Sequence, residues 1–398
     1  MSVPRHRVAI TGFGLITCLG GNADSTWHAL EAGKSGIGKL SLFDTSDCRC
    51  QTGGEIKSLD LPPTKLTVKQ QRRLDRATRM LLLAAEEALD RAKFQPSDLP
   101  TILGTTGGGM HAGEIYHRAL LERNGAKPSL LMQYTPQRQP FDLQIAFGYR
   151  GPLLVFANAC ASSANAIGYA FQLVRSGQAD RVLTGGYDAL AKVIFVGFDS
   201  LQASTPERCR PFDKNRSGLA ISEGAGVLLV ESFDAARARG ADVLGEVAGY
   251  GQSVDTNHMT QPHPDGDGAT RAMTDAIADA GLSPSDIDYI NAHGTATPQN
   301  DRMESKAIHR VFGTRAVPVS STKGAVGHSL GGAGGIEAVI CALALQHQKL
   351  PTNVNYETPD PDCNLAVVRE STPAKLRSVL SNNFGFGGLN ASLVFRAP

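Results

Sequence analysis

Residues 153–174 read LLVFANACASSANAIGYAFQLV. An apolar run typical of a strand passes through small residues into a stretch with helical spacing, which is the pattern of a strand that turns directly into a helix. Residues 317–345, VPVSSTKGAVGHSLGGAGGIEAVICALAL, repeat this scheme, and SEGAGVLLVE at 222–231 is similarly repeated by FGFGGLNASLVF at 384–395. The repetition predicts two similar halves, residues 1–240 and 241–398, with a site between them that draws loops from both.

Glycines and short apolar runs extend this pattern along the chain. The 43 glycines fall at junctions between β-branched runs and helical stretches, as the turns of α/β proteins require. The predicted class is therefore α/β, with several strands apolar on both faces, as in a sheet covered by helices. Predicted strands are Arg7–Thr11, Leu153–Ala157, Arg181–Gly185, Gly226–Glu231, Tyr289–Ala292, Val317–Ser320 and Ala391–Phe395, and predicted helices are Leu74–Ala92 and Ala269–Ala280.

Bulk composition argues against several classes of protein. The 39 Lys and Arg residues balance 38 Asp and Glu residues, so no overall charge favours nucleic acid or an anionic membrane. The seven cysteines are scattered and odd in number, which predicts free thiols in a reducing cytoplasm. The start, MSVPRHRVAITGFG, fits a first strand better than a signal peptide. The apolar stretches 153–174 and 336–345 are interrupted or short, so we expect no membrane span.

Cys160 is the sharpest candidate for chemistry. It lies where an apolar strand ends and where residues 161–164 can open a helix, so its thiol is expected at the positive end of the helix dipole. Such a position lowers the pKa of a thiol and raises its thiolate fraction. The alternative is a buried, inert cysteine, which is the usual fate of this residue type. The small neighbours clear space for a substrate and favour the reactive thiol.

Two of the ten histidines share a similar setting. His293, in NAHGTATPQND, and His328, in STKGAVGHSLGGAGG, both follow strand-like segments and lie in glycine-flanked turns. Imidazoles in such turns can point into a cleft, whereas the other eight lie in polar, helical or terminal contexts and are predicted to be structural or at the surface. An isolated histidine seldom has a functional role, but two in matching settings favour a catalytic set with Cys160.

Motifs spread over the whole chain, in order, resemble the elongating β-ketoacyl-[acyl carrier protein] synthases of the thiolase superfamily. The motifs are VAITGFG, RRLDRATRM, ACASSANAIG, RPFDKNRSG with SEGAG, NAHGTATPQND, STKGAVGHSLGGAGGIEA and SNNFGFGGLNAS. The resemblance implies a thiolase-like fold in which two βαβαβαββ halves pack as five α-β-α-β-α layers. It also implies an acyltransferase that performs decarboxylative Claisen condensation of an acyl thioester with malonyl-acyl carrier protein, in fatty-acid, polyketide or polyene synthesis.

The same resemblance implies roles and partners. Cys160 is the acylated nucleophile, while His293 and His328 bind the malonyl thioester carbonyl and promote decarboxylation; two imidazole N–H donors in a dry pocket stabilise an enolate without a metal. The other implied roles are Lys323 behind the second histidine, the N–H groups of Cys160 and Phe386 as the oxyanion hole, Asp301, Glu304 and Phe384 as supporting residues, and Thr295 and Thr297 on the pantetheine arm. Without the resemblance, Lys323 is a solvated turn lysine, and Asp301 and Glu304 are as well explained as a solvated helix start. Acyl carrier protein and a homologous subunit, identical or not, are the implied partners, with no cofactor beyond the carrier's phosphopantetheine.

Other classes fit the sequence less well. A thiolase would carry a second cysteine in the C-terminal glycine loop, an initiating synthase would pair its cysteine with one histidine and an asparagine, and a chain-length factor would lack Cys160. Gly12 and Gly14 lack the third glycine of a dinucleotide-binding fingerprint, and Cys48 and Cys50 lack a second pair at zinc-ligand spacing. A pure binding role stays open, as does a catalytic subunit of a specialised type II polyketide system paired with a chain-length-factor homologue.

The chain also departs from the family pattern. Ser217, Leu219 and Ser222 stand where aspartate, phenylalanine and glycine are usual, and YTPQRQPFDLQ at 134–144 lacks the apolar character of this dimer-interface region. Chain length, pathway and the identity of the second subunit therefore stay open. Gly107 resembles an acyl-pocket position that holds isoleucine in one elongating subclass and glycine in another. Glycine there removes a gate, which predicts entry of medium, unsaturated or bulky acyl chains.

Overall fold

The computed structural model describes residues 6–398, and within them eleven strands form one mixed sheet. Its strands, in sheet order, are β12 (Ala366–Val367), β10 (Pro318–Ser320), β9 (Tyr289–Asn291), β14 (Ser378–Gly385), β15 (Leu389–Arg396), β8 (Gly245–Val254), β1 (Val8–Thr17), β7 (Gly224–Ser232), β6 (Arg181–Asp188), β4 (Thr101–Gly104) and β5 (Leu153–Phe156). Outside it, β2 (Gly38–Lys39) pairs with β3 (Thr52–Gly53), and β11 (Lys349–Leu350) pairs with β13 (Thr372–Pro373).

The large sheet contains one strand arrangement twice. In the first series β1 pairs antiparallel with β7 and β7 with β6, while β6, β4 and β5 run parallel. In the second series β8, β15, β14, β9 and β10 repeat these pairings in the same order. The series meet where Val8–Ile10 of β1 pairs with Gly245–Val247 of β8. The two similar segments in each half of the sequence thus occupy matching positions, while a domain boundary at residue 240 stays a prediction.

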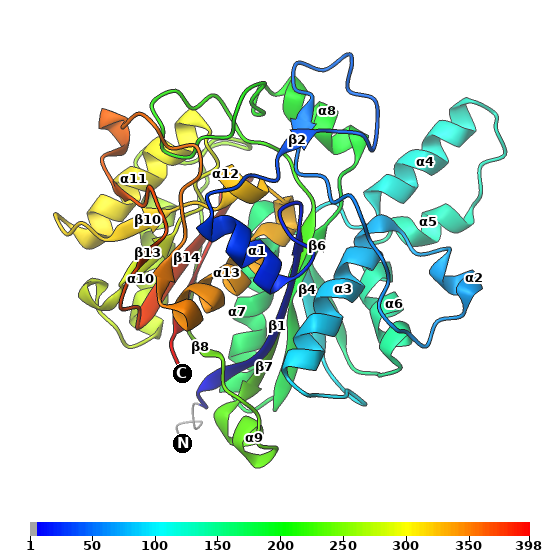
Figure 1. Cartoon of the computed structure of the whole chain (residues 1–398), viewed down its shortest axis with the longest axis horizontal. Coiled ribbons are helices and arrows are strands. Elements are labelled where there is room, and N and C mark those ends of the chain that lie inside the picture. The colour runs from blue at the N-terminus through cyan, green and yellow to red at the C-terminus, as the bar shows by residue number, and fades with distance from the viewer. Residues whose placement is uncertain (1–5) are drawn as a thin grey trace.

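Helices cover the outside of both series and fill the space between them (Figure 1). α7 (Ser162–Arg175) packs against β4 and β6 of the first series and against β8 and β15 of the second, and α13 (Ala333–His347) similarly contacts β6, β7 and β14. α3 (Arg76–Arg91) lies against β1 and β7 on one outer face, and α10 (Asp267–Asp279) lies against β8 and β15 on the other. These α-β-α-β-α layers confirm the predicted thiolase-like fold.

The remaining helices decorate this core. They are α1 (Ala23–Glu31), α2 (Val68–Gln71), α4 (Met110–Leu121), α5 (Ser129–Tyr134), α6 (Arg138–Phe147), α8 (Lys192–Ser200), α9 (Phe233–Ala238), α11 (Pro298–Phe312) and α12 (Lys323–Val326), with short 3₁₀ turns η1 (Ala159–Ala161), η2 (Pro284–Asp286), η3 (Leu330–Gly332) and η4 (Pro361–Cys363). α4 and α5 contact each other and project from the body of the molecule (Figure 1).

The central helix α13 is buried on all sides. Every residue from Ala333 to Leu345 is buried, and Glu337 is the one charged residue among them. A helix that is apolar all round belongs in a protein core or in a membrane. Residues Leu330–His347 are apolar and long enough for a membrane span by composition, yet 89% of this stretch is buried inside the fold. The apolar surface is therefore accounted for by packing between the two strand series.

The first strand is longer than predicted. β1 continues through Gly12 and Gly14 to Thr17 and keeps its pairing with β7. A Cβ atom on Gly12 would lie 2.0 Å from the carbonyl oxygen of Ala88, and one on Gly14 would lie 2.0 Å from that of Ala84, both in α3. The two glycines therefore permit close approach of a helix to the strand and do not mark a turn. The other predicted strands and helices are present, with ends shifted by a few residues.

A buried ion pair anchors α3 to the loops around it. Arg76 donates from Nε and Nη2 to the two carboxylate oxygens of Glu223 at 2.6 and 2.5 Å. The Glu223 side chain is fully buried and also accepts the N–H groups of Ile56 and Leu190 at 2.8 and 3.2 Å. One carboxylate thereby connects the RRLDRATRM motif, the SEGAG motif and the loops that follow β3 and β6.

Replacing Arg76 with methionine should lower the free energy of unfolding by about 3–5 kcal/mol, because the change leaves the Glu223 carboxylate buried without its counter-charge. Urea denaturation followed by circular dichroism measures the change. Arg72→Met is the matched control, since Arg72 is exposed and a surface change of this kind shifts stability by about 0.5 kcal/mol or less. Equal stability of the two variants would contradict the anchoring role.

Candidate active site

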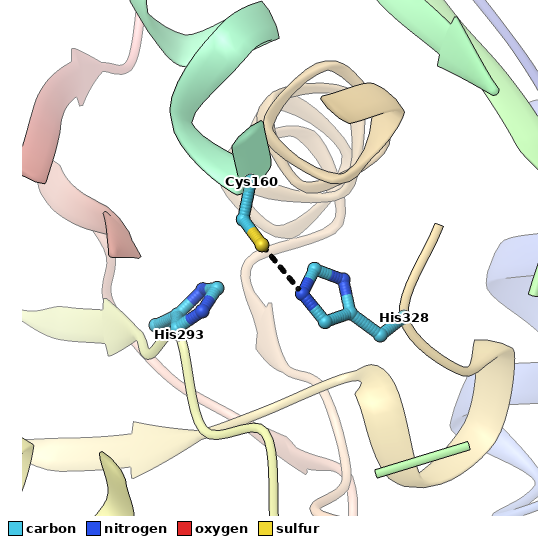
Figure 2. Close-up of side chains that lie close together, drawn as sticks. All are labelled: Cys160, His293 and His328. Atoms are coloured by element: carbon cyan, nitrogen blue, oxygen red, sulfur yellow. Dashed lines mark hydrogen bonds between the residues drawn. The ribbon is translucent and has the colours of Figure 1, made fainter. Parts of the chain in front are cut away.

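The carboxyl ends of several strands converge on one cavity of about 170 Å³. β5 leads to Cys160, β9 leads to His293, and β10 leads to the segment that carries Lys323 and His328. Parallel strands of an α/β sheet end at a common edge, where sites form. Cys160, His293 and His328 point toward one another from three separate segments (Figure 2). The structure thus brings together the three residues singled out from the sequence, and both strand series contribute.

Cys160 lies in a tight turn between β5 and α7. The preceding residue, Ala159, has a φ of 56°, a conformation that residues with side chains rarely adopt. The Ser162 hydroxyl stabilises the turn by donating to the Ala159 carbonyl at 2.6 Å and accepting the Asn158 N–H at 2.9 Å. The backbone N–H groups of Phe386 and of Cys160 itself approach the sulfur. The turn therefore presents the thiol beside two amide donors.

The predicted lowering of the thiol pKa is wrong. Cys160 is only 6% exposed, and burial raises the pKa of its thiol to about 11. The charge of Lys323 and the N–H of Phe386 lower this pKa, but the cost of removing a thiolate from water exceeds both contributions. The resting side chain is a neutral thiol, so a neighbouring base must accept its proton before or during attack.

His328 is placed to be that base. Its Nε2 atom lies 3.1 Å from Cys160 Sγ (Figure 2). The backbone is fixed on both sides, because its N–H donates to Ala220 at 2.7 Å and its carbonyl accepts the Ser222 N–H at 3.0 Å. Burial, assisted by the charge of Lys323, lowers the pKa of His328 well below its usual value, so the ring is neutral. Nδ1 has no hydrogen-bond partner in residues 6–398, and neither tautomer is locked.

His293 faces the same point from the other side. Its ring centre lies 5.4 Å from that of His328, with the planes nearly perpendicular. Lys323 Nζ lies 3.5 Å from His293 Nδ1. Because an ammonium group can only donate, Nδ1 accepts and Nε2 carries the hydrogen. Burial and the charge of Lys323 lower the pKa of His293 well below its usual value. The neutral ring therefore offers one N–H donor on the side away from Lys323.

The three side chains also resemble the donor set of a zinc site. Their sulfur and nitrogen atoms all lie within 4.8 Å of one another. Zinc ligation requires a nitrogen lone pair from each imidazole, with the second ring nitrogen donating to an acceptor. In His293 the contact with Lys323 produces the reverse tautomer, in which Nε2 is protonated. The arrangement suits recognition of a substrate oxygen better than ligation of a cation.

The ion partner of Lys323 is Glu337 of α13, a residue that the sequence-based interpretation did not assign. The two side chains form a salt bridge and are 1% and 2% exposed. The second carboxylate oxygen of Glu337 accepts Asn383 Nδ2 at 2.9 Å. Burial raises the pKa of Glu337, while Lys323 and Asn383 act in the opposite direction. An acidic residue inside an otherwise apolar helix is the signal in the sequence that points to such a buried partner.

The two predicted supporting acids hold loops and do not line the cavity. Glu304 accepts the backbone N–H groups of His293 and Gly294, both at 2.8 Å, and burial raises its pKa to about 7. Asp301 accepts the N–H groups of Phe212 and Ala296 at 2.7 and 3.2 Å. Both carboxylates therefore fix the backbone that carries His293 and the residues after it.

The lining of the cavity includes most of the other predicted residues. Phe384 is 6% exposed and its ring centre lies 5.8 Å from that of His293. Phe386 lies on the following turn of the same glycine-rich segment. Thr295 and Thr297 line the cavity with hydroxyl oxygens 2.9 Å apart. These residues therefore surround the same cavity as the Cys160 thiol.

The positions that depart from the family pattern are divided. Ser217 and Leu219 line the cavity, whereas Ser222 holds the backbone of His328. Gly107 does not line this cavity; a Cβ atom there would lie 2.9 Å from Ile194 Cδ1. Gly107 therefore lies against α8 and not at the wall of this cavity, and its role as an acyl gate stays a prediction.

Comparisons with known proteins agree with this geometry. The model of the β-ketoacyl synthase N-terminal domain matches residues 5–236, and the model of the C-terminal domain matches residues 244–357. The 3-oxoacyl-[acyl-carrier-protein] synthase 2 of Synechocystis sp. is 39% identical over 412 residues, covering 99% of both chains.

Solved structures give the same result. The ishigamide ketosynthase/chain length factor superimposes with a TM-score of 0.94 and 33% identity, covering 99% of this chain and 100% of that one. A type II polyketide ketosynthase, in complex with its acyl-carrier protein and bound to the hexaketide, superimposes with a TM-score of 0.90 and 28% identity over the same shares. With a matching sequence, a matching fold and a cysteine flanked by two neutral imidazoles, the chain belongs to the β-ketoacyl synthase family.

Proposed function

We propose that this protein is a β-ketoacyl-acyl carrier protein synthase that condenses an acyl thioester with malonyl-acyl carrier protein and releases carbon dioxide. One observation carries the proposal: Cys160 Sγ lies 3.1 Å from a neutral imidazole nitrogen of His328, while His293 offers a fixed N–H donor nearby. A base beside a thiol activates a nucleophile, and a second donor stabilises a developing oxyanion. The 39% identity to a 3-oxoacyl-[acyl-carrier-protein] synthase supports the same reaction.

The first half of the reaction acylates Cys160. His328 Nε2 accepts the thiol proton as the sulfur attacks the carbonyl carbon of the incoming acyl thioester. The tetrahedral oxyanion is stabilised by the N–H groups of Cys160 and Phe386, which approach the sulfur in the resting enzyme. The intermediate collapses, the carbon–sulfur bond to the carrier breaks, and the proton on His328 passes to the departing phosphopantetheine thiolate.

The second half of the reaction uses both histidines as donors. The thioester oxygen of the malonyl group accepts the N–H of His293 and, in the other tautomer, that of His328. Loss of carbon dioxide transfers the electron pair of the breaking carbon–carbon bond into an enolate, whose oxygen these donors stabilise. The enolate carbon then attacks the acyl carbonyl on Cys160, the carbon–sulfur bond to Cys160 breaks, and the released thiolate takes a proton from solvent. Nδ1 of His328, which has no hydrogen-bond partner within the described residues 6–398, permits the exchange of tautomers.

The shape of the cavity supports a carrier-bound substrate. Cys160, Thr295 and Thr297 line the same cavity. A phosphopantetheine arm is thin and flexible and carries amides that such hydroxyls can bind. Acyl carrier protein is therefore the proposed partner, and the chain needs no further cofactor for the steps above. The seven cysteines are free thiols, which supports the proposed location in a reducing cytoplasm.

A homologous subunit is the second proposed partner. β5 is the last strand of the sheet, and its Leu154 is 42% exposed. The preceding helix α6 exposes Phe141 and Ile145, at 47% and 36%, and Tyr169 of α7 is exposed beside β5. An apolar edge strand of this kind invites pairing with another chain. The polar character of residues 134–144 is misleading, because Gln139 is fully buried and bonded within its own chain.

Because Cys160, His293 and His328 have different roles, their alanine variants should lose different parts of the reaction. Cys160→Ala should abolish acyl transfer and condensation, because no nucleophile remains. His293→Ala should reduce decarboxylation of malonyl-acyl carrier protein about 100-fold or more while Cys160 is still acylated. His328→Ala should slow both half-reactions. Radiolabelled acyl transfer and carbon dioxide release are measured separately, and intact condensation by Cys160→Ala would overturn the mechanism.

The state of the thiol predicts a pH dependence. With the pKa of Cys160 raised to about 11, its thiolate fraction rises about tenfold per pH unit between pH 7 and 9, and alkylation by iodoacetamide should follow. Mass spectrometry of the peptide that contains Cys160 measures the rate. Urea-unfolded protein is the control and should level off near the ordinary thiol pKa of about 8.5. A rate independent of pH would instead indicate a preformed thiolate–imidazolium pair.

The exposed edge strand predicts that the protein forms a dimer. Whether the second subunit is identical or a homologue distinguishes the two proposed functions. Light scattering of a homodimeric synthase should give twice the chain mass of 42.1 kDa. Leu154→Glu should dissociate the dimer, because it places a charge in the apolar interface. Val68→Glu, also at an exposed apolar residue, should leave the mass unchanged. A catalytic subunit that needs a chain-length-factor homologue should be monomeric alone and dimeric when the two are mixed. A dimer unaffected by Leu154→Glu would place the interface elsewhere.

A further inference from the structure

Asp188, the last residue of β6, has an environment that no step of the proposed reaction uses. Its side chain is fully buried, and every group that donates to it is a backbone N–H or a hydroxyl. It does not line the catalytic cavity. A buried carboxylate surrounded by neutral donors is costly unless the donors are held firmly in place. Such a group therefore indicates a requirement for defined backbone positions around it.

The two oxygens of Asp188 bind two different segments. Oδ1 accepts the Thr105 hydroxyl and the Gly107 N–H, both at 2.7 Å, and the Gly108 N–H at 3.2 Å. Oδ2 accepts the Thr106 N–H at 2.9 Å and the Gly331 N–H at 2.7 Å. The first four donors belong to the loop after β4, and Gly331 belongs to the turn η3.

The two segments lead to different parts of the active site. Gly331 lies three residues after His328, and a Cβ atom on it would lie 2.5 Å from the Thr106 nitrogen, so η3 is pressed against the loop. On the other side, Gly107 lies against Ile194 of α8. Phe198 of the same helix lines the cavity, and its ring stacks on that of Phe386 at 5.6 Å. Asp188 therefore lies between the segment that carries His328 and α8, the helix that forms part of the cavity wall and is called the α8 wall below.

We propose that Asp188 is a positioning residue that couples the loop of residues 105–108 to His328, so that displacement of the α8 wall by a bound acyl group alters the placement of the base. This inference rests on the proposed function and deepens it. Asp188 touches no reacting atom and reaches His328 through Gly331 and the turn η3. Both segments move together because one carboxylate satisfies donors from each, and separating them would leave buried N–H groups without acceptors.

The second strand series offers a comparison. Glu304 accepts two consecutive N–H groups, those of His293 and Gly294, in the loop that follows β9. β9 occupies the position in its series that β4 occupies in the first. An acidic side chain thus holds the equivalent loop in both series and binds backbone close to a catalytic histidine in each. Of these two residues, Asp188 also joins two separate backbone segments, the loop after β4 and the turn η3. Holding the loop alone would not require this second contact.

The primary test replaces Asp188 with asparagine, which keeps the shape but places an NH₂ group against N–H donors. Decarboxylation of malonyl-acyl carrier protein without an acyl primer should fall roughly 3- to 30-fold. The ratio of acylation rates for long and short acyl carriers should also change. Thr184→Val is the matched control, because Thr184 lies on the same strand, is fully buried and has a hydroxyl without a partner in residues 6–398. If Asp188→Asn lowers the melting temperature but changes neither primer-free decarboxylation nor the ratio of acylation rates, the proposal is overturned.

A second pair of variants tests the coupling at a distance from the carboxylate. Thr105→Val removes the hydroxyl that donates to Asp188 and should slow primer-free decarboxylation, whereas Thr105→Ser keeps the hydroxyl and should restore it. In an Asp188→Asn background, Thr105→Val should have no further effect on this rate. Additive losses would show that the two residues act independently and would refute the coupling.

Failure of the proposed function itself gives a different result. An unmodified enzyme that neither decarboxylates malonyl-acyl carrier protein nor becomes acylated at Cys160 would refute the condensation reaction. Alkylation of Cys160 by iodoacetamide gives a readout that requires no turnover. Because the negative charge of Asp188 raises the pKa of the Cys160 thiol, Asp188→Asn should accelerate alkylation, and Thr105→Val should change its rate less. An unmodified enzyme that is active, with variants that match it in every assay, would overturn the coupling alone.

Discussion

The buried ion pair between Lys323 and Glu337 is the interaction on which the active site depends. Lys323 makes His293 an acceptor at Nδ1 and a donor at Nε2, and it lowers the pKa of both histidines. Without the carboxylate of α13, an ammonium group in this position would be an uncompensated buried charge. The burial that keeps the imidazoles neutral also keeps the thiol protonated, so the site stores its nucleophile as a thiol and relies on His328 to activate it.

Placement of this pair follows from the two strand series. α7 and α13 fill one shared space, so the strand ends of both series face the same cavity. The first series supplies Cys160 from the turn before α7, and the second supplies His293 and His328. Close contacts at glycines make this possible: a Cβ atom on Gly334 of α13 would lie 2.7 Å from the Ala164 nitrogen of α7. Neither series contains a complete site.

The positions of the catalytic residues were predictable from the sequence because they depend on local patterns. A strand followed by small residues and a helix located Cys160, and glycine-flanked turns located His293 and His328. What depends on contacts far apart in the sequence could not be predicted. Glu337 and Asp188 act on loops that no spacing rule connects to them. The thiol pKa was predicted with the wrong sign because burial, which the sequence pattern does not reveal, outweighs the charge of Lys323 and the neighbouring backbone N–H groups. β1 was predicted too short because Gly12 and Gly14 look like a turn until α3 is seen to pack on them.

The complete burial of α13 has a consequence for biosynthesis. The helix ends at residue 347, but β14, which covers part of its surface, spans residues 378–385, and β15 closes the second series at residue 396. During synthesis, this apolar helix therefore stays without part of its cover until residues 378–396 have emerged from the ribosome. Exposed apolar surface in such intermediates leads to aggregation. Nascent chains halted before β14 are expected to depend on chaperones, because the core around α13 is completed only when β14 and β15 have been made.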